Sequence, residues 1–97
     1  MLSISEEDGC ILCIFTGRMD TIASQDIMED IRSELLNKPD KMVFDLQDVN
    51  YISSAFLRIC IEAAQSLPED SFSVINTDPM IKKTFKVAGL EEMIHVE

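Results

Sequence analysis

The chain is 97 residues long, 46% of them hydrophobic, and its 18 acidic and 8 basic residues give a formal net charge of −10. This length predicts one small domain over residues 1–97, and because no stretch approaches the about 20 apolar residues that cross a bilayer, we expect a soluble protein without membrane insertion. The acidic N-terminus does not resemble a secretory signal, so we expect a cytoplasmic location, and the negative charge argues against direct nucleic-acid binding and favours a protein partner with a basic face.

The first two predicted elements are strands. Residues 2–7 and 10–17 are short apolar or alternating segments on either side of the turn sequence EDG, which predicts an antiparallel β-hairpin. Cys10 and Cys13 have the spacing of a redox or zinc motif. Because residues three apart on a strand point to opposite faces, we expect both cysteines to be structural and to bind no metal.

The segment RMDTIASQDIMEDIRSELLNKPD follows. In it Ile27, Ile31 and Leu35 recur every four residues, which predicts an amphipathic helix. Thr21 or Ser24 is expected to cap its start, and the sequence NKP marks its end.

The segment KMVFDL, residues 41–46, is almost continuously apolar between turn signals, so it predicts a central strand covered on both faces. The next segment, SSAFLRICIEAAQSL, predicts a helix with few polar positions. Its polar side chains Ser54, Arg58 and Glu62 lie four apart and form the one stripe expected to meet solvent. Arg58 is expected either to pair with Glu62, as this spacing favours, or to serve a site at the start of this helix.

Three more elements complete the chain. Residues 71–76 predict a strand, residues 78–89 a helix with Asp78 as its cap and Gly89 as its stop, and residues 93–96 a last short strand. The resulting order is β-β-α-β-α-β-α-β. It predicts an α/β fold with a mixed sheet, in which an N-terminal antiparallel hairpin is followed by alternating helices and strands that pair in parallel.

Two adjacent serines, Ser53 and Ser54, stand where the central strand gives way to the second helix. A serine at such a place caps the helix and contributes about 1 kcal/mol over alanine. One cap needs only one hydroxyl. Because a helix N-terminus also favours anions, Ser54 is either the cap or a residue that can carry a phosphate.

The segment FDLQDVNYISSAFLRI resembles the signature of the STAS domain, the fold of bacterial anti-sigma factor antagonists. The sequence GRMDT, at 17–21, looks like the turn before the first helix of that family, and KVAGLEEMIHV, at 86–96, looks like its closing segment. The resemblance covers nearly the whole chain and implies a single STAS-like domain with a mixed sheet.

In this alignment Ser54 falls on the phosphorylatable serine of the family, Ser53 on the acid before it and Phe56 on a glycine. The resemblance implies an anti-sigma factor antagonist that binds an anti-sigma factor with serine kinase activity, is switched by phosphorylation of Ser54 and is restored by a phosphatase. Asp20 matches the aspartate of the family's turn, so it is expected either to line the partner-binding surface or to cap the first helix. Ser53 and Phe56, at the matched positions, and Arg58, one turn after Ser54, are further candidates for the partner-binding surface.

Two other classes of function compete with this one. A non-phosphorylated STAS docking subunit of a larger assembly, such as a lipid-transport complex, is favoured by Ser53 and Phe56, which depart from the family pattern. An enzyme is disfavoured, because the single histidine, His95, is remote in sequence from both serines and no catalytic serine motif, glycine-rich loop or metal-ligand cluster occurs. We therefore expect no catalytic residue, cofactor or metal.

Overall fold

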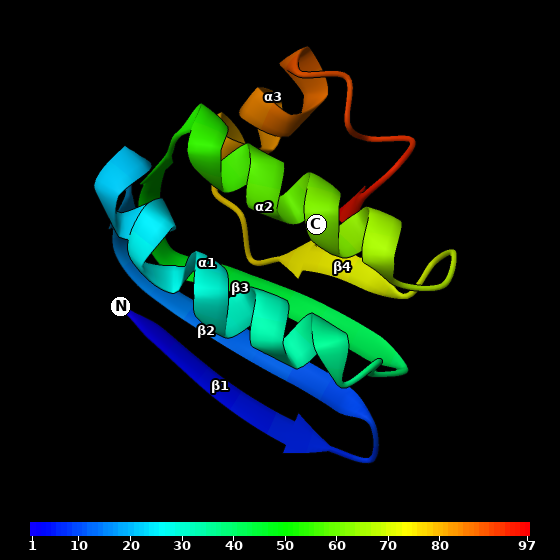
Figure 1. Ribbon diagram of the computed structural model, residues 1–97. Helices are drawn as coiled ribbons and strands as arrows, with labels where there is room; N and C mark the ends of the chain where they lie inside the picture. Colours follow the sequence, from blue (N-terminus) through cyan, green and yellow to red (C-terminus); the bar gives the residue numbers. More distant parts are fainter.

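The computed structural model describes all 97 residues and confirms the predicted α/β fold and element order (Figure 1). The helices are α1 (Thr21–Leu36), α2 (Ser54–Ser66) and α3 (Pro79–Val87), and the strands are β1 (Leu2–Glu7), β2 (Cys10–Met19), β3 (Lys41–Ile52), β4 (Phe72–Ile75) and β5 (His95–Val96).

The five strands form one mixed sheet in the order β1-β2-β3-β4-β5. The predicted antiparallel hairpin joins β1 to β2, and all later strands pair in parallel. Each crossover therefore moves one strand further in the same direction. Since such crossovers are right-handed, they place α1, α2 and α3 on the same face of the sheet.

The sequence-based expectation that β3 is covered on both faces is wrong. β3 is central, but only Met42, Phe44 and Leu46 are fully buried against the helices. Val43 and Asp45, which alternate with them, are half-buried on the other face. The strand also continues past Leu46 to Ile52 and pairs there with the end of β2.

Aromatic side chains join α2 to the sheet. The ring of Phe56 lies edge-on to the ring of Phe15, with centroids 5.2 Å apart, and Phe44 packs edge-on against both Phe15 and Phe72 at 4.8 Å. Such edge-to-face pairs contribute about 0.5–1.5 kcal/mol each beyond the burial of their area. Phe56 thus holds the first turn of α2 on the core.

The assignment of Phe56 to the partner-binding surface is therefore wrong, because the side chain is 0% exposed. The helical period explains its direction. Phe56 shares one face of α2 with Ile59, Cys60 and Ala63, which follow it at spacings of three, four and seven residues and are all buried.

The two cysteines of the hairpin lie on opposite faces of β2, as expected. Cys13 is buried in the core with its strand neighbours Ile11 and Phe15, whereas Cys10 is partly exposed. Burial, and then the nearby Glu34, raise the pKa of the Cys13 thiol to about 12. The Cys13 thiol is therefore neutral at physiological pH and packs as a small apolar group.

Side chains begin and end the helices. Asp20, and neither Thr21 nor Ser24, caps α1, since its carboxylate accepts a hydrogen bond of 2.9 Å from the Ala23 backbone N–H. Asp78 caps α3 as predicted. None of the helices combines the length and the apolar composition needed to cross a membrane.

Candidate functional site

The candidate site lies where β2 and β3 end and α1 and α2 begin. The Ser53 backbone N–H donates a hydrogen bond of 2.9 Å to the carbonyl of Met19, which ties the start of α2 to the end of β2. Asp20 follows Met19 and is partly exposed. This tie brings the N-terminal turns of two helices together, so their free N–H groups and positive dipole ends are neighbours.

Ser53 is the cap of α2. Its Oγ accepts a hydrogen bond of 3.2 Å from the Phe56 backbone N–H and lies 3.4 Å from the Oγ of Ser24 in α1. Ser24 is completely buried and Ser53 is 7% exposed. The assignment of Ser53 to the partner-binding surface is therefore wrong, because its hydroxyl is turned inward and used between the two helices.

Ser54 is the first residue of α2, and its side chain is exposed. The side-chain hydrogen bonds of the junction involve Ser24 and Ser53 but not the Ser54 hydroxyl. The sequence alone leaves open whether Ser54 caps the helix or can carry a modification, and the structure identifies the cap. Ser53 fills that role, and the Ser54 hydroxyl remains accessible.

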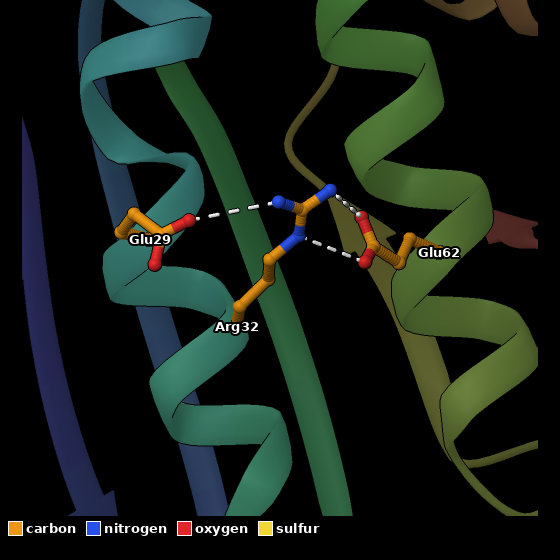
Figure 2. Close-up of polar contacts among 3 residues, drawn as sticks. All are labelled: Glu29, Arg32 and Glu62. Atoms are coloured by element: carbon orange, nitrogen blue, oxygen red, sulfur yellow. Dashed lines mark hydrogen bonds and ion pairs between the residues drawn. The ribbon is translucent and has the colours of Figure 1, made fainter.

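Arg58 lies one helical turn after Ser54 and is exposed. The expected ion pair between Arg58 and Glu62 does not form. Figure 2 shows that Glu62 reaches across to Arg32 of α1 instead, with Arg32 Nε 2.9 Å from its carboxylate and Nη2 at 3.3 Å. Glu29 flanks the same guanidinium at 3.6 Å. Arg58 is left without an ion-pair partner beside Ser54.

Arg18 and Tyr51 also belong to this region, although sequence reasoning missed them. They are neighbours across β2 and β3, and the Arg18 guanidinium carbon lies 4.1 Å from the centre of the Tyr51 ring. Both are exposed. Strand alternation indicates their exposure. Successive side chains of a strand point to opposite faces, and Arg18 and Tyr51 each precede a buried residue, Met19 and Ile52.

We call the exposed parts of Arg18, Asp20, Tyr51, Ser54 and Arg58 the junction surface. It combines two arginines without ion-pair partners, an aromatic ring and one free hydroxyl. Arginine and tyrosine are enriched among the residues that dominate binding energy in protein interfaces. The arrangement therefore suits contact with a protein.

The junction surface contains no nucleophilic side chain with a general base next to it. His95, the one histidine, lies in β5, which β4 separates from β3, and its Nε2 is 3.3 Å from the Glu97 carboxylate. No three histidine, cysteine, aspartate or glutamate side chains are grouped so that they could hold a metal ion.

Solved structures of the same fold are similar to the whole chain. An anti-sigma factor antagonist from Mycobacterium paratuberculosis superposes with a TM-score of 0.88 at 20% identity, over 99% of this chain and 83% of that one. A putative anti-sigma factor antagonist from Thermotoga maritima gives 0.87 at 13% identity, over 98% and 84%. The Bacillus cell fate determinant SpoIIAA in its phosphorylated form gives 0.76 at 13% identity, over 100% and 91%.

No curated protein matches the chain by sequence. The family model of the STAS domain matches residues 1–97. Together with the mixed sheet, the N-terminal hairpin and the three helices, this match shows that the chain belongs to the STAS-domain family.

Proposed function

We propose that this chain is a regulatory protein of the anti-sigma factor antagonist type. In this proposal the junction surface binds an anti-sigma factor with serine kinase activity, phosphorylation of Ser54 releases it, and a phosphatase restores binding. The single observation that carries the proposal is the difference between the two serines. Ser53 is buried and caps α2, whereas Ser54 is exposed and its hydroxyl is free.

A phosphate on Ser54 is compatible with the fold. The modification adds about −1.5 to −2 charges at neutral pH, and the N-terminal turn of a helix is where such charge is best tolerated. Because the cap is supplied by Ser53, modification of Ser54 breaks no hydrogen bond of the junction. Arg58, one turn later, is within the same stripe and has no competing ion pair.

The same phosphate opposes binding. It arrives on a chain that already carries a formal charge of −10, at a surface in contact with another protein. An unpaired charge held in an interface costs several kcal/mol, and each 1.4 kcal/mol is a factor of ten in affinity. The solved SpoIIAA structures, one unphosphorylated and one phosphorylated, have the same fold as this chain, which supports a modification that leaves the fold intact.

One observation favours a second function, a permanent docking subunit of a larger assembly such as a lipid-transport complex. Ser53 stands where the STAS signature usually has an acid, so no carboxylate precedes Ser54. The other departure, Phe56, no longer favours this alternative, because its side chain is in the core and leaves the junction surface unobstructed.

Phosphosite mapping tests the proposal. The chain is incubated with ATP and extract of its native cells, and the phosphate is located by mass spectrometry. We expect phosphate on Ser54, and none on the chain carrying Ser54→Ala. Phosphate on Ser53, or an equal amount on the Ser54→Ala chain, contradicts the proposal. Absence of any phosphate under conditions that phosphorylate a control substrate favours the permanent subunit.

A further inference from the structure

A second surface, on α3, differs in charge from the rest of the molecule. Three of the eight basic residues of the chain, Lys82, Lys83 and Lys86, lie within this nine-residue helix, which contains no acidic residue. All three side chains are exposed, and none takes part in an ion pair. The helix is therefore a concentrated positive patch on a chain of net charge −10.

Apolar side chains border the same patch. Met80 is 74% exposed and Val87 is 77% exposed, both at the surface of α3. A hollow of about 380 Å³ lies between α2 and α3, lined by Leu57, Met80, Lys83, Thr84, Val87 and Ala88. In Figure 1 α3 lies close to α2, and Leu57 of α2 lines this hollow together with residues of α3.

A larger hollow, of about 700 Å³, adjoins the first, and the two share Lys83 and Val87. The larger hollow is lined in addition by Pro79, Lys82, Lys86 and Glu91. The surface thus has an apolar floor on the side of α2 and ammonium groups on the other side. We call the two hollows together the α3 groove.

We infer that the α3 groove is a docking site for an acidic, amphipathic segment of a partner protein. The lysines attract the carboxylates of such a segment and set its orientation, and apolar side chains of the segment fill the hollow beside Leu57, Met80 and Val87. Burial of the exposed side chains of Met80 and Val87 supplies the favourable free energy, since charge complementarity contributes more to orientation and association rate.

The charge distribution also argues for a peptide segment over an extended anionic surface. An extended bilayer or nucleic acid placed against α3 also approaches the acidic residues that flank the helix, among them Asp78 and Glu91, and is repelled by the net charge of −10. A short segment carries few charges and fits within the groove alone.

The α3 groove is separate from the phosphorylation site. Leu57 lies one turn after Ser54, so one partner chain can contact both places, but no lining residue belongs to the junction surface. Docking in the groove therefore does not require modification of Ser54. The inference consequently stands or falls independently of the proposed switch.

The test uses the full chain and a synthetic helical peptide that carries leucines on one face and glutamates on the other. Binding is followed by two-dimensional NMR of the backbone amides. We expect the shifted signals to cluster in residues 79–91 and around Leu57. Shifts that cluster elsewhere, or the absence of shifts, overturn the inference.

Matched variants sharpen this test. Lys82→Glu with Lys83→Glu should weaken peptide binding by about tenfold or more, whereas Lys38→Glu with Lys41→Glu, which changes the net charge equally at exposed positions outside the groove, should leave it within about twofold. Val87→Ser should weaken binding at unchanged charge. Equal losses from both lysine pairs indicate unspecific attraction and overturn the inference.

Two further measurements separate other occupants. The wild-type chain alone should not self-associate through the groove in sedimentation experiments. Self-association that is lost in the Lys82→Glu, Lys83→Glu variant would assign the groove to a second copy of the chain. Phosphatidylglycerol vesicles should bind the chain less tightly than the peptide does. Tighter binding by the vesicles would assign the patch to a lipid surface. Either contrary result overturns the inference of a peptide ligand.

Discussion

The Oγ atoms of Ser24 and Ser53 lie 3.4 Å apart in the buried space between the first turns of α1 and α2. Because Ser53 also accepts a hydrogen bond from the Phe56 backbone N–H, its hydroxyl serves both helices at once. This contact explains Ser53, whose hydroxyl is needed inside the fold. It does not involve Ser54, whose side chain is exposed.

The first prediction concerns the cap. Ser53→Ala should lower the free energy of unfolding by about 1–2 kcal/mol, because the mutation removes the N-cap of α2 and leaves the buried hydroxyl of Ser24 unpaired. Urea denaturation measures the loss. Ser54→Ala is the matched control and should stay within about 0.5 kcal/mol of wild type. Equal losses from the two mutations would contradict the assignment of the cap.

The second prediction concerns Phe56. Phe56→Ala should lower the free energy of unfolding by about 3–5 kcal/mol, because the side chain is fully buried against Phe15 and Phe44. Tyr51→Ala, at an exposed aromatic side chain, serves as the control and should cost much less. A loss below about 1 kcal/mol for Phe56→Ala in thermal or urea unfolding would place the ring outside the core.

The third prediction concerns the ion pair between α1 and α2. Hydrogen bonds from Arg32 to Glu62 raise the pKa of the guanidinium, but the pair is exposed and screened. A double-mutant cycle with Arg32→Ala and Glu62→Ala should give a small favourable coupling that falls in high salt. The same cycle with Glu29, at 3.6 Å and 84% exposed, should give less. The reverse ranking would contradict the observed geometry.

The fourth prediction concerns the cysteines. Iodoacetamide should modify only Cys10 in the folded chain and all three cysteines after denaturation, because Cys13 and Cys60 are buried and burial raises the pKa of both thiols. Mass spectrometry counts the adducts. Rapid modification of Cys13 without unfolding would contradict the burial.

The raised pKa of Cys13, about 12, also sets a pH dependence. An unfolded chain releases this proton near the ordinary thiol pKa of about 8.5, whereas the folded chain retains it. The contribution to stability is therefore complete below about pH 8.5 and is lost as pH rises toward 12. Cys13→Val should make the free energy of unfolding less sensitive to pH in this window.

Much of the fold follows from patterns that are local in the sequence. Short apolar runs predict the strands, and apolar residues that recur about every four positions predict the helices. The alternation of strands with helices implies parallel pairing. The coverage of β3 was predicted wrongly for a physical reason. Val43 is as apolar as Met42 and Phe44, so the segment looks buried on both sides, whereas the handedness of the crossovers places all the helices on one face.

The candidate site could be predicted only in part. Ser54 and Asp20 lie at helix starts, as predicted, because helix starts have local signals; their roles in binding and modification stay predictions. The resemblance aligns Phe56 with a glycine in the first turn of the helix and so placed it on the surface, although its helical spacing from Ile59 and Cys60 indicated the core face. The pairing of Arg32 with Glu62 had no such signal, since it joins residues 30 positions apart and depends on how two helices pack.

The most direct test of the central claim measures the affinity of the partner for chains with and without phosphate on Ser54. The partner is first captured from native cells with the Ser54→Ala chain and identified by mass spectrometry. Phosphoserine is then incorporated at position 54, or at the exposed Ser66 at the other end of α2 as a control of equal charge. We predict that phosphate on Ser54 weakens binding by about 100-fold or more, whereas phosphate on Ser66 changes it by less than about threefold. Equal affinity of the unmodified chain and the chain phosphorylated on Ser54 would contradict the switch.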